Sequence, residues 1–377
     1  MRIALLTYST KPRGGVVHTL NLAEALARAG AEVTVWTLGR GGDAAFFRAV
    51  DPAVRVVVVP FTASDTETVG ARILRSIDTL RAMFTPDGYD IVHAQDCISA
   101  NAVGDCVRTI HHLDDFTTPE LARCHERAIR DPYARVCVSA AVAAEVRERY
   151  GFTPTVIPNG VEYDRFARAA EPRAAPDRRR WRDRLGRYVL AVGGIEPRKG
   201  SIDLLEAFAI LGEPGVRLVF AGGETLFDYR EYRARFDARA EELGIDVTVL
   251  GPVANDELPA LVAAATALPF FSVKEGFGLA AMEALAAGIP VVARDLPVLR
   301  EVFSDAVTYA TTPRELAERL RHTLRSDAAR RERGRVIARG FDWDSAAAAH
   351  LRFYAGVAES DPRRGRAEAS TPMVRPG

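Results

Sequence analysis

The sequence has no excess of charge of either sign. Its 377 residues include 50 Lys plus Arg and 50 Asp plus Glu, so its formal net charge is zero. Nucleic-acid binding relies on a positive surface, which such a composition does not supply over the whole molecule. We therefore expect no nucleic-acid partner, and any anion must be bound by a local cluster of basic residues.

Cysteines and long apolar runs are also scarce. The four cysteines, at positions 97, 106, 124 and 137, show no C-x-x-C spacing, and we expect them to be plain reduced thiols. The first apolar run stops at Thr7, which is too short for a signal-peptide core, and no stretch approaches the roughly 18 apolar residues of a membrane span. We expect a cytoplasmic protein with at most peripheral membrane contact.

What the sequence does have is enough apolar material for two domains, since 48% of its residues are hydrophobic. Strand-like apolar runs alternate with helical segments up to residue 149, and the same order repeats from Tyr188 to Ala293. This pattern predicts an α/β fold with two doubly wound Rossmann-like domains facing across a cleft. We expect an N-terminal acceptor-side domain at 1–165 and a C-terminal donor-binding domain at 187–340.

The remaining segments have distinct compositions. Residues 166–186 are rich in Arg, Ala and Pro, which is typical of an exposed linker, and the basic run 178–182 fits a solvated helix better than a membrane-binding patch. By analogy with similar folds, a helix at 341–358 should pack back on the N-terminal domain. The charged tail, 359–377, is expected to be disordered.

A first constellation of candidate residues follows the expected strand that ends at Val192. Gly193 and Gly194 come directly after it, and Arg198 and Lys199 precede a helix that starts near residue 201. Glycines allow close backbone approach, a helix start supplies free N–H groups, and the two cations add charge, which together suit a diphosphate. A tight turn with a solvated basic pair is the alternative.

A second constellation contains two glutamates. Glu275 lies in a loop that opens a helix, and Glu283 lies within its first two turns, so both side chains could reach one ligand above the helix start. Carboxylates there suit sugar and ribose hydroxyls. Alternatively, Glu283 is a favourable acid near a helix N-terminus and Glu275 an exposed loop acid.

Two histidines end a first-domain strand. Because neighbouring strand residues point to opposite faces, at most one of His111 and His112 should enter the cleft. His111 could hydrogen-bond a substrate or handle a proton, and a core histidine bonded to a carbonyl is the alternative.

Together these segments resemble the retaining GT-B glycosyltransferases of family 4 over nearly the whole chain. The most specific match is the glutamate pair separated by seven residues. The other matching segments are Gly14–Gly15, Val136–Ser139, Val156–Val161, Val192–Gly200 and Glu283–Val292.

The resemblance implies a nucleotide-sugar donor and retention of anomeric configuration, with Glu275 on the donor sugar, Glu283 on the ribose and Lys199 on the diphosphate. His111, Glu275 and Lys199 would lie nearest the chemistry. With the residues of the two constellations included, the full set of expected donor contacts is Gly14, Gly15, Gly193, Gly194, Arg198, Lys199, Glu275, Gly276, Phe277, Gly278, Leu279 and Glu283.

The sequence departs from the family at one position. Where the family commonly has Gly-Arg after the strand, this chain has Gly193 followed by Gly194, so the usual first phosphate-binding arginine is missing. We hypothesise that Arg198 supplies the charge from a different backbone position.

The Asp-x-Asp spelling at Asp342 and Asp344 does not predict a metal site, because it follows no buried strand and precedes a helix that such residues cap. We expect no catalytic metal and no cofactor, the nucleotide-sugar being a substrate. The acceptor, whether small molecule, lipid or glycan, is not encoded in any motif, and neither are the nucleotide base and the sugar.

Three other functions remain open. A sugar-nucleotide epimerase could share this architecture, and it would need acid and base groups. A Rossmann dehydrogenase is disfavoured because neither glycine pair spells Gly-x-Gly-x-x-Gly. A non-catalytic sugar-binding protein would show no turnover.

Overall fold

The computed structural model describes residues 1–62, 64, 67–116, 118–222, 229–325 and 328–359. Within this part, the first half of the chain forms a seven-stranded parallel sheet in the order β3-β2-β1-β4-β5-β6-β7. The strand order reverses between β1 and β4, and ligands of such sheets bind beyond the carboxyl ends of the strands at this switch point. The strands are β1 (Arg2–Thr7), β2 (Glu32–Arg40), β3 (Val54–Phe61), β4 (Ile91–Ala94), β5 (Val107–Ile110), β6 (Ala134–Cys137) and β7 (Thr155–Val156).

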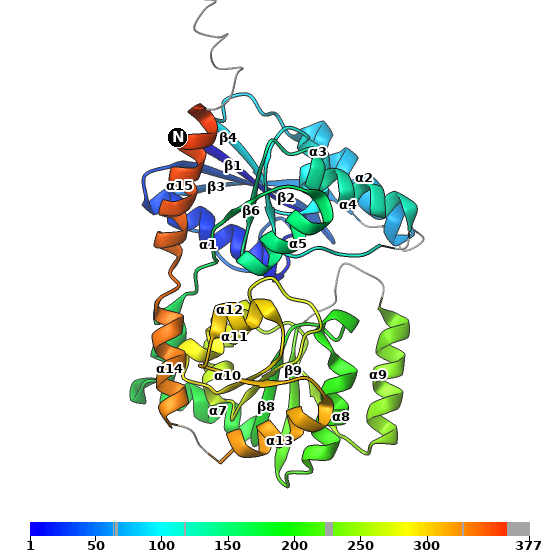
Figure 1. Cartoon of the computed structure of the whole chain (residues 1–377), viewed down its shortest axis with the longest axis vertical. Coiled ribbons are helices and arrows are strands. Elements are labelled where there is room, and N and C mark those ends of the chain that lie inside the picture. Colours follow the sequence, from blue (N-terminus) through cyan, green and yellow to red (C-terminus); the bar gives the residue numbers. More distant parts are fainter. Residues whose placement is uncertain (63, 65–66, 117, 223–228, 326–327, 360–377) are drawn as a thin grey trace, which may run out of the picture.

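Helices cover both faces of this sheet. Alternate strand residues point to opposite sides, so each face presents apolar side chains for helices to bury. Leu5 packs with α1 and the last helix of the chain, α15, whereas Leu6 packs with α2, α3 and α4 on the other face (Figure 1). Asp96 and Ser139 cap α3 and α5 by accepting hydrogen bonds from the backbone N–H groups of the first turn. The helices are α1 (Gly14–Arg28), α2 (Val69–Met83), α3 (Cys97–Val103), α4 (Pro119–Arg130) and α5 (Ala140–Tyr150).

The second half, again within the described residues, contains two three-stranded parallel sheets, β10-β9-β8 and β11-β12-β13. A bridge between Val189 and Ala267 joins β8 to the segment before β11, so the six strands form one continuous array. This arrangement confirms the predicted fold class. The strands are β8 (Arg187–Val192), β9 (Val216–Ala221), β10 (Val247–Val249), β11 (Leu268–Phe270), β12 (Val291–Arg294) and β13 (Thr308–Ala310).

Helices surround this second array and bury two apolar clusters against it. Short α11 is almost wholly apolar, and Met282 and Leu285 on it are buried. The elements are η2 (Pro197–Lys199), α8 (Ser201–Leu211), α9 (Arg230–Glu242), α10 (Leu258–Ala264), α11 (Leu279–Ala286), α12 (Pro297–Phe303), α13 (Pro313–Thr323) and α14 (Ala328–Arg339).

The segment expected to be an exposed linker is helical and packed against the second half. It contains α6 (Tyr163–Ala170), η1 (Pro172–Ala174) and α7 (Ala175–Leu185). Phe166, Trp181 and Leu185 are buried in the same apolar cluster as α10 and α11, while Arg179 and Arg180 face solvent. The expectation of an exposed connector was therefore wrong, because a few large apolar residues per helix suffice to dock a segment whose other residues are charged.

The chain returns to the first half at its end. Helices α14 and α15 (Trp343–Glu359) follow one another along one side of the molecule, and α15 lies against α1 (Figure 1). Trp343 and Tyr354 are buried in the core of the first half. Where the chain crosses back, Val161 N–H donates to the carbonyl of Phe341, so the two crossings are hydrogen-bonded to each other. Residues 360–377 of the expected disordered tail lie outside the described residues.

No helix in the described ranges is long and apolar enough to cross a membrane.

Candidate functional site

Three charged side chains that are far apart in the sequence meet at the carboxyl ends of β8 and β11. Lys199 Nζ lies 2.6 Å from Glu275 Oε1, and Arg198 Nη1 lies 3.3 Å from the same oxygen. Burial alone would raise the pKa of Glu275, but the charges of Lys199 and Arg198 lower it to about 2. Glu275 is therefore ionised at neutral pH, with both cations around one carboxylate oxygen.

A fourth charge, which is not among the site residues expected from the sequence, completes this group. Glu196 Oε1 lies 3.0 Å from Arg198 Nη2, and its side chain is 11% exposed. Burial lowers the pKa of Arg198, but Glu275 and Glu196 outweigh it and raise that pKa. The set of Glu196, Arg198, Lys199 and Glu275, called here the charged quartet, is neutral in sum. The only sequence signal for Glu196 was its position in the loop after β8.

The glycine pair lies beside the quartet. Gly193 and Gly194 line a small cavity together with Lys199 and Ser272. Lys199 Nζ also lies 5.2 Å from the centre of the Phe270 ring, which contributes a cation–π contact. The structure thus brings the residues of the first predicted constellation to one place.

The loop of the second constellation touches the opposite half of the molecule. A Cβ atom added at Gly276 would lie 1.6 Å from the carbonyl oxygen of His111, so only glycine fits this contact. Gly278 is the N-cap residue of α11 and has a positive φ of 96°, a conformation that favours glycine, whereas Phe277 is buried. These residues shape the loop between the two halves, and Leu279 is the first residue of α11.

Glu283 has different charged neighbours from Glu275. Burial raises the pKa of Glu283 to about 8, while Arg165 lowers it and Glu162 raises it. Both neighbours belong to the α6 region, whereas Glu275 interacts with Lys199 and Arg198. Because Glu275 and Glu283 have different charged neighbours, the expectation that both face one loop gains no support. The raised pKa means that Glu283 is mainly protonated at neutral pH.

The structure distinguishes the two histidines. The Nε2 atom of His111 lies 3.7 Å from where a Cβ of Gly15 would be, so the ring packs on the start of α1. Its ring also meets that of His18, with centroids 4.8 Å apart. By contrast, His112 Nε2 lies 3.2 Å from Asp114 Oδ1.

His111 is uncharged, since burial holds its pKa well below the usual value. In the described structure its Nε2 atom is buried and has no hydrogen-bond partner. A buried polar atom of this kind is normally satisfied by water or a ligand. Gly14, in contrast, is exposed, and a Cβ there would meet nothing within 4 Å.

Further polar contacts join the two halves near these residues. Lys274 Nζ lies 3.4 Å from Asp115 Oδ2, which belongs to the loop after β5. Glu301 accepts hydrogen bonds from the N–H groups of Ala140 and Ala141 at 2.7 and 2.8 Å, so an acid of α12 caps α5. The junction is therefore held by charges on both sides of the candidate residues.

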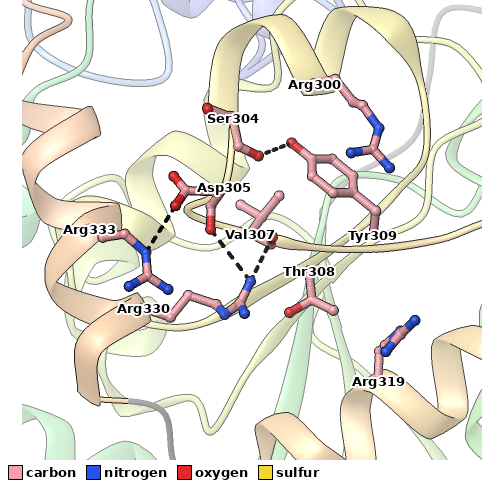
Figure 2. Close-up of a pocket in the computed structure, with 9 residues that line it drawn as sticks. All are labelled: Arg300, Ser304, Asp305, Val307, Thr308, Tyr309, Arg319, Arg330 and Arg333. Atoms are coloured by element: carbon pink, nitrogen blue, oxygen red, sulfur yellow. Dashed lines mark hydrogen bonds and ion pairs between the residues drawn. The ribbon is translucent and has the colours of Figure 1, made fainter.

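A second cavity lies away from the candidate residues, at the amino end of β13 (Figure 2). Arg330 donates to the carbonyl of Val307 at 3.0 Å, and Arg333 Nε lies 3.4 Å from Asp305 Oδ2. These contacts join α14 to the segment before β13. Because none of the predicted site residues line this cavity, it is not the candidate site.

Two Rossmann-like halves, with charged groups gathered at the carboxyl ends of their strands, define the GT-B class of glycosyltransferases. Comparison with known proteins agrees. The family model described as Glycosyl transferases group 1 matches residues 177–340, and that described as Glycosyltransferase Family 4 matches residues 12–165. The chain belongs to glycosyltransferase family 4 and is a glycosyltransferase of class EC 2.4.

The relatives cover nearly the whole chain. A D-inositol 3-phosphate glycosyltransferase from Xylanimonas cellulosilytica is 31% identical over 96% of this chain and 98% of its own length. A phosphatidyl-myo-inositol mannosyltransferase from Mycobacterium leprae is 29% identical over the same shares.

Solved structures show the same fold. Sucrose-phosphate synthase from Thermosynechococcus elongatus has a TM-score of 0.78 at 20% identity, over 96% of this chain and all of that chain. Anabaena HepE in complex with UDP and glucose has a TM-score of 0.72 at 21% identity, over 94% of this chain and all of that chain.

Proposed function

We propose that the protein transfers a sugar from a nucleotide-sugar to an acceptor with retention of anomeric configuration and without a metal ion. The observation that carries this proposal is the convergence of Arg198 and Lys199 on Glu275 at the carboxyl ends of β8 and β11. Solved structures of the same fold hold UDP, which supports a nucleotide ligand for this chain.

Arg198 and Lys199 would stabilise the leaving diphosphate. An ammonium group has three donors, and among the described residues Lys199 donates one of them to Glu275, which leaves two for phosphate oxygens. Charge that develops on the leaving oxygen is stabilised most by groups that are already fixed in position. Glu275 and Glu196 hold both cations in place before any ligand binds.

Metal independence is supported by the contacts that the two acids of the Asp-x-Asp pair make. Asp342 Oδ1 accepts a hydrogen bond from Ser345 N at 2.7 Å, which caps α15, and Asp344 pairs with Arg28 at 2.5 Å. Both acids serve the packing of α15 rather than the quartet. The two cations would then supply the positive charge that a divalent ion supplies in metal-dependent transferases.

Glu275 would accept hydrogen bonds from donor-sugar hydroxyls, and protonated Glu283 would bond the ribose. The acceptor hydroxyl would attack the anomeric carbon on the face that the diphosphate leaves. The C–O bond to the diphosphate breaks as the new glycosidic bond forms, and the departing phosphate oxygen takes the hydroxyl proton. Neutral His111 would position a substrate hydroxyl rather than carry charge.

A donor panel tests this proposal. UDP-, GDP-, ADP- and TDP-sugars are offered to the wild type and to Lys199→Met, with Lys11→Met as the control because its exposed lysine pairs only with Asp43 among the described residues. We expect one nucleotide class to raise the Tm of wild type and Lys11→Met, and Lys199→Met to lose most of that shift and at least tenfold in kcat/KM.

Three further readouts address the chemistry. Product NMR should show the anomeric configuration of the donor, and EDTA should leave the rate unchanged. Inversion would refute the retaining mechanism, and loss of activity with EDTA would refute metal independence. Nucleoside diphosphate release that needs no acceptor, with an altered sugar as product, would favour an epimerase.

A further inference from the structure

An arginine outside the predicted donor site ends the middle strand of the sheet β11-β12-β13. Arg294 is the last residue of β12, and β11 and β13 pair with β12 on either side. Its side chain is 15% exposed. Ligands of parallel α/β sheets bind beyond the carboxyl ends of the strands, so this residue lies at the edge where a ligand is expected.

The guanidinium group of Arg294 bonds the chain directly after each neighbouring strand. Its Nε atom donates to the carbonyl oxygen of Phe271, the first residue after β11, at 3.1 Å. Its Nη1 atom donates to the carbonyl oxygen of Thr311, the first residue after β13, at 3.4 Å. The guanidinium carbon also lies 3.8 Å from the centre of the Phe271 ring, which gives a close cation–π contact. Arg294 therefore ties three strand ends together.

The third nitrogen of the same guanidinium group faces the start of α8. The Nη2 atom forms an ion pair with Asp203, which lies in the first turn of that helix. The same atom lies 3.3 Å from where a Cβ of Gly200 would be. Gly200 is the N-cap residue of α8, and a Cβ there would also overlap the carbonyl oxygen of Phe271. The start of α8 and the end of β11 therefore meet backbone to backbone beside Arg294.

The two segments that meet here carry the charged quartet. Arg198 and Lys199 directly precede the N-cap of α8, whereas Glu275 lies in the loop after β11. The N–H of Val273 in that loop donates to the carbonyl oxygen of Arg198 at 2.8 Å. The 2.6 Å contact between Lys199 and Glu275 thus depends on how the two backbones are held, and Arg294 bonds both of them.

Arg294 also neutralises an acid at a place where negative charge opposes anion binding. A carboxylate in the first turn of a helix is favourable for the helix itself, but the charge of Asp203 would repel a diphosphate bound at the start of α8. Arg294 pairs with it, so the two side chains together add no net charge beside Arg198 and Lys199. Because the Asp203 side chain is 40% exposed, the fold should tolerate the loss of its partner.

We propose that Arg294 is a positioning residue of the donor site, which holds the start of α8 against the loop after β11 and neutralises Asp203 so that a diphosphate can bind. The planar guanidinium group suits this role, because its three nitrogens bond in three fixed directions that the single ammonium of lysine does not reproduce. Arg294 acts through the placement of Lys199 and Glu275 and does not itself contact the ligand. This inference rests on the proposed transferase function, whose donor it helps to bind.

The two partners of the ion pair distinguish this role from a purely structural one. If the pair only stabilised the fold, Arg294→Met and Asp203→Asn would impair the protein alike, because each breaks the same pair. In the proposed role their effects on diphosphate binding differ in sign. Arg294→Met leaves an uncompensated acid near the anion, whereas Asp203→Asn leaves an uncompensated cation and an amide that can still accept the hydrogen bond.

The test is isothermal titration with UDP, GDP, ADP and TDP at low and high salt. The proteins are wild type, Arg294→Met, Arg294→Lys, Asp203→Asn and the double variant Arg294→Met/Asp203→Asn. Arg300→Met is the matched control, because Arg300 also pairs with an aspartate, Asp295, at 2.7 Å and lies 4.3 Å from the centre of the Tyr309 ring, but it lines the second cavity (Figure 2). Thermal unfolding verifies that each variant folds.

We expect the diphosphate that binds wild type to bind Arg294→Met about tenfold more weakly, and Asp203→Asn as tightly as wild type or more tightly. The double variant should recover the electrostatic part of the loss. Arg294→Lys keeps the charge but not the three bonds, so its Kd should lie between those of wild type and Arg294→Met. High salt should reduce the loss in Arg294→Met, and Arg300→Met should bind like wild type.

Equal Kd values for wild type and Arg294→Met would overturn the positioning role, and so would equal losses in Arg294→Met and Asp203→Asn. Failure of every diphosphate to bind wild type would overturn this inference together with the donor site. Binding of a diphosphate that depends on Arg294, without transfer of any sugar, would instead refute the proposed function and leave the positioning role in place.

Discussion

Replacing Glu283 by glutamine should make the protein increasingly more stable than wild type as the pH rises through the neutral range. Burial raises the pKa of this carboxyl from 4.5 to about 8. Above pH 4.5 the Glu283 carboxyl therefore ionises readily in the unfolded chain but not in the folded protein. Its contribution to stability is fully present below pH 4.5 and is lost as pH rises through 8.

The magnitude follows from the shift. At about 1.36 kcal/mol per pKa unit, the whole shift corresponds to at most about 5 kcal/mol of stability. Most of it, about 3.5 kcal/mol, falls between pH 5 and pH 8. Glutamine has the shape of the protonated acid and does not ionise, so Glu283→Gln should lack this loss.

The assay is urea unfolding of wild type and Glu283→Gln at pH 5, 6, 7, 8 and 9, with the free energy of unfolding compared at each pH. We expect the two proteins to be similar at pH 5 and the variant to gain up to about 3.5 kcal/mol relative to wild type by pH 8. Parallel profiles would refute the reasoning, since they would show that Glu283 ionises as easily in the folded protein as in the unfolded chain.

Glu275→Gln provides a control of opposite sign. Lysine and arginine neighbours lower the pKa of Glu275 to about 2, against the effect of burial. Its stabilising contribution is present above pH 4.5 and is lost as pH falls toward 2. Glu275→Gln should therefore be less stable than wild type at pH 7, by at most about 3.4 kcal/mol, and this difference should shrink in acid.

Three other substitutions have definite expected outcomes. Gly276→Ala would place a methyl group 1.6 Å from the carbonyl oxygen of His111, so we expect the two halves to separate. Solution scattering should then show a larger radius of gyration, and most transfer activity should be lost. Unchanged scattering and activity would contradict this. Because the Trp181 side chain is 5% exposed, Trp181→Ala should lower the free energy of unfolding by about 3–5 kcal/mol in urea denaturation. A loss under 1 kcal/mol would mean that α7 is not docked. Asn159→Ala removes the acceptor 2.8 Å from His18 Nδ1 and should cost about 1–3 kcal/mol, measured by thermal unfolding; an unchanged Tm would show that water replaces the amide.

The sequence was informative about which strands and helices form, but it predicted poorly which of them pack against one another. Apolar runs of strand length, separated by helical segments, predicted two parallel sheets, and both are present. For the segment 166–186 the same composition-based reasoning failed, because it averaged many arginines with the few large residues that dock its helices. The residues Phe166 and Trp181 are buried although their neighbours are charged.

The candidate site shows the same division. Motif residues such as Arg198, Lys199 and Glu275 were recognisable by type and spacing, since the chemistry of a diphosphate or a sugar requires those groups. That both cations share one oxygen of Glu275 could not be predicted, because Lys199 and Glu275 are 76 positions apart and meet only once both sheets have formed. Glu196 is only two residues from Arg198, but their ion pair depends on the folded conformation of the loop after β8.

By itself, the sequence determined the alternation of strands and helices, the glycine-rich loops and the glutamate pair, because each depends on a short stretch of chain. Only the tertiary structure decided that His111 rather than His112 lies against Gly15, and that Glu283 is protonated at neutral pH while Glu275 is ionised. The physical reason is that desolvation and charge pairing depend on every element packed around a group, and that environment is assembled from distant parts of the chain.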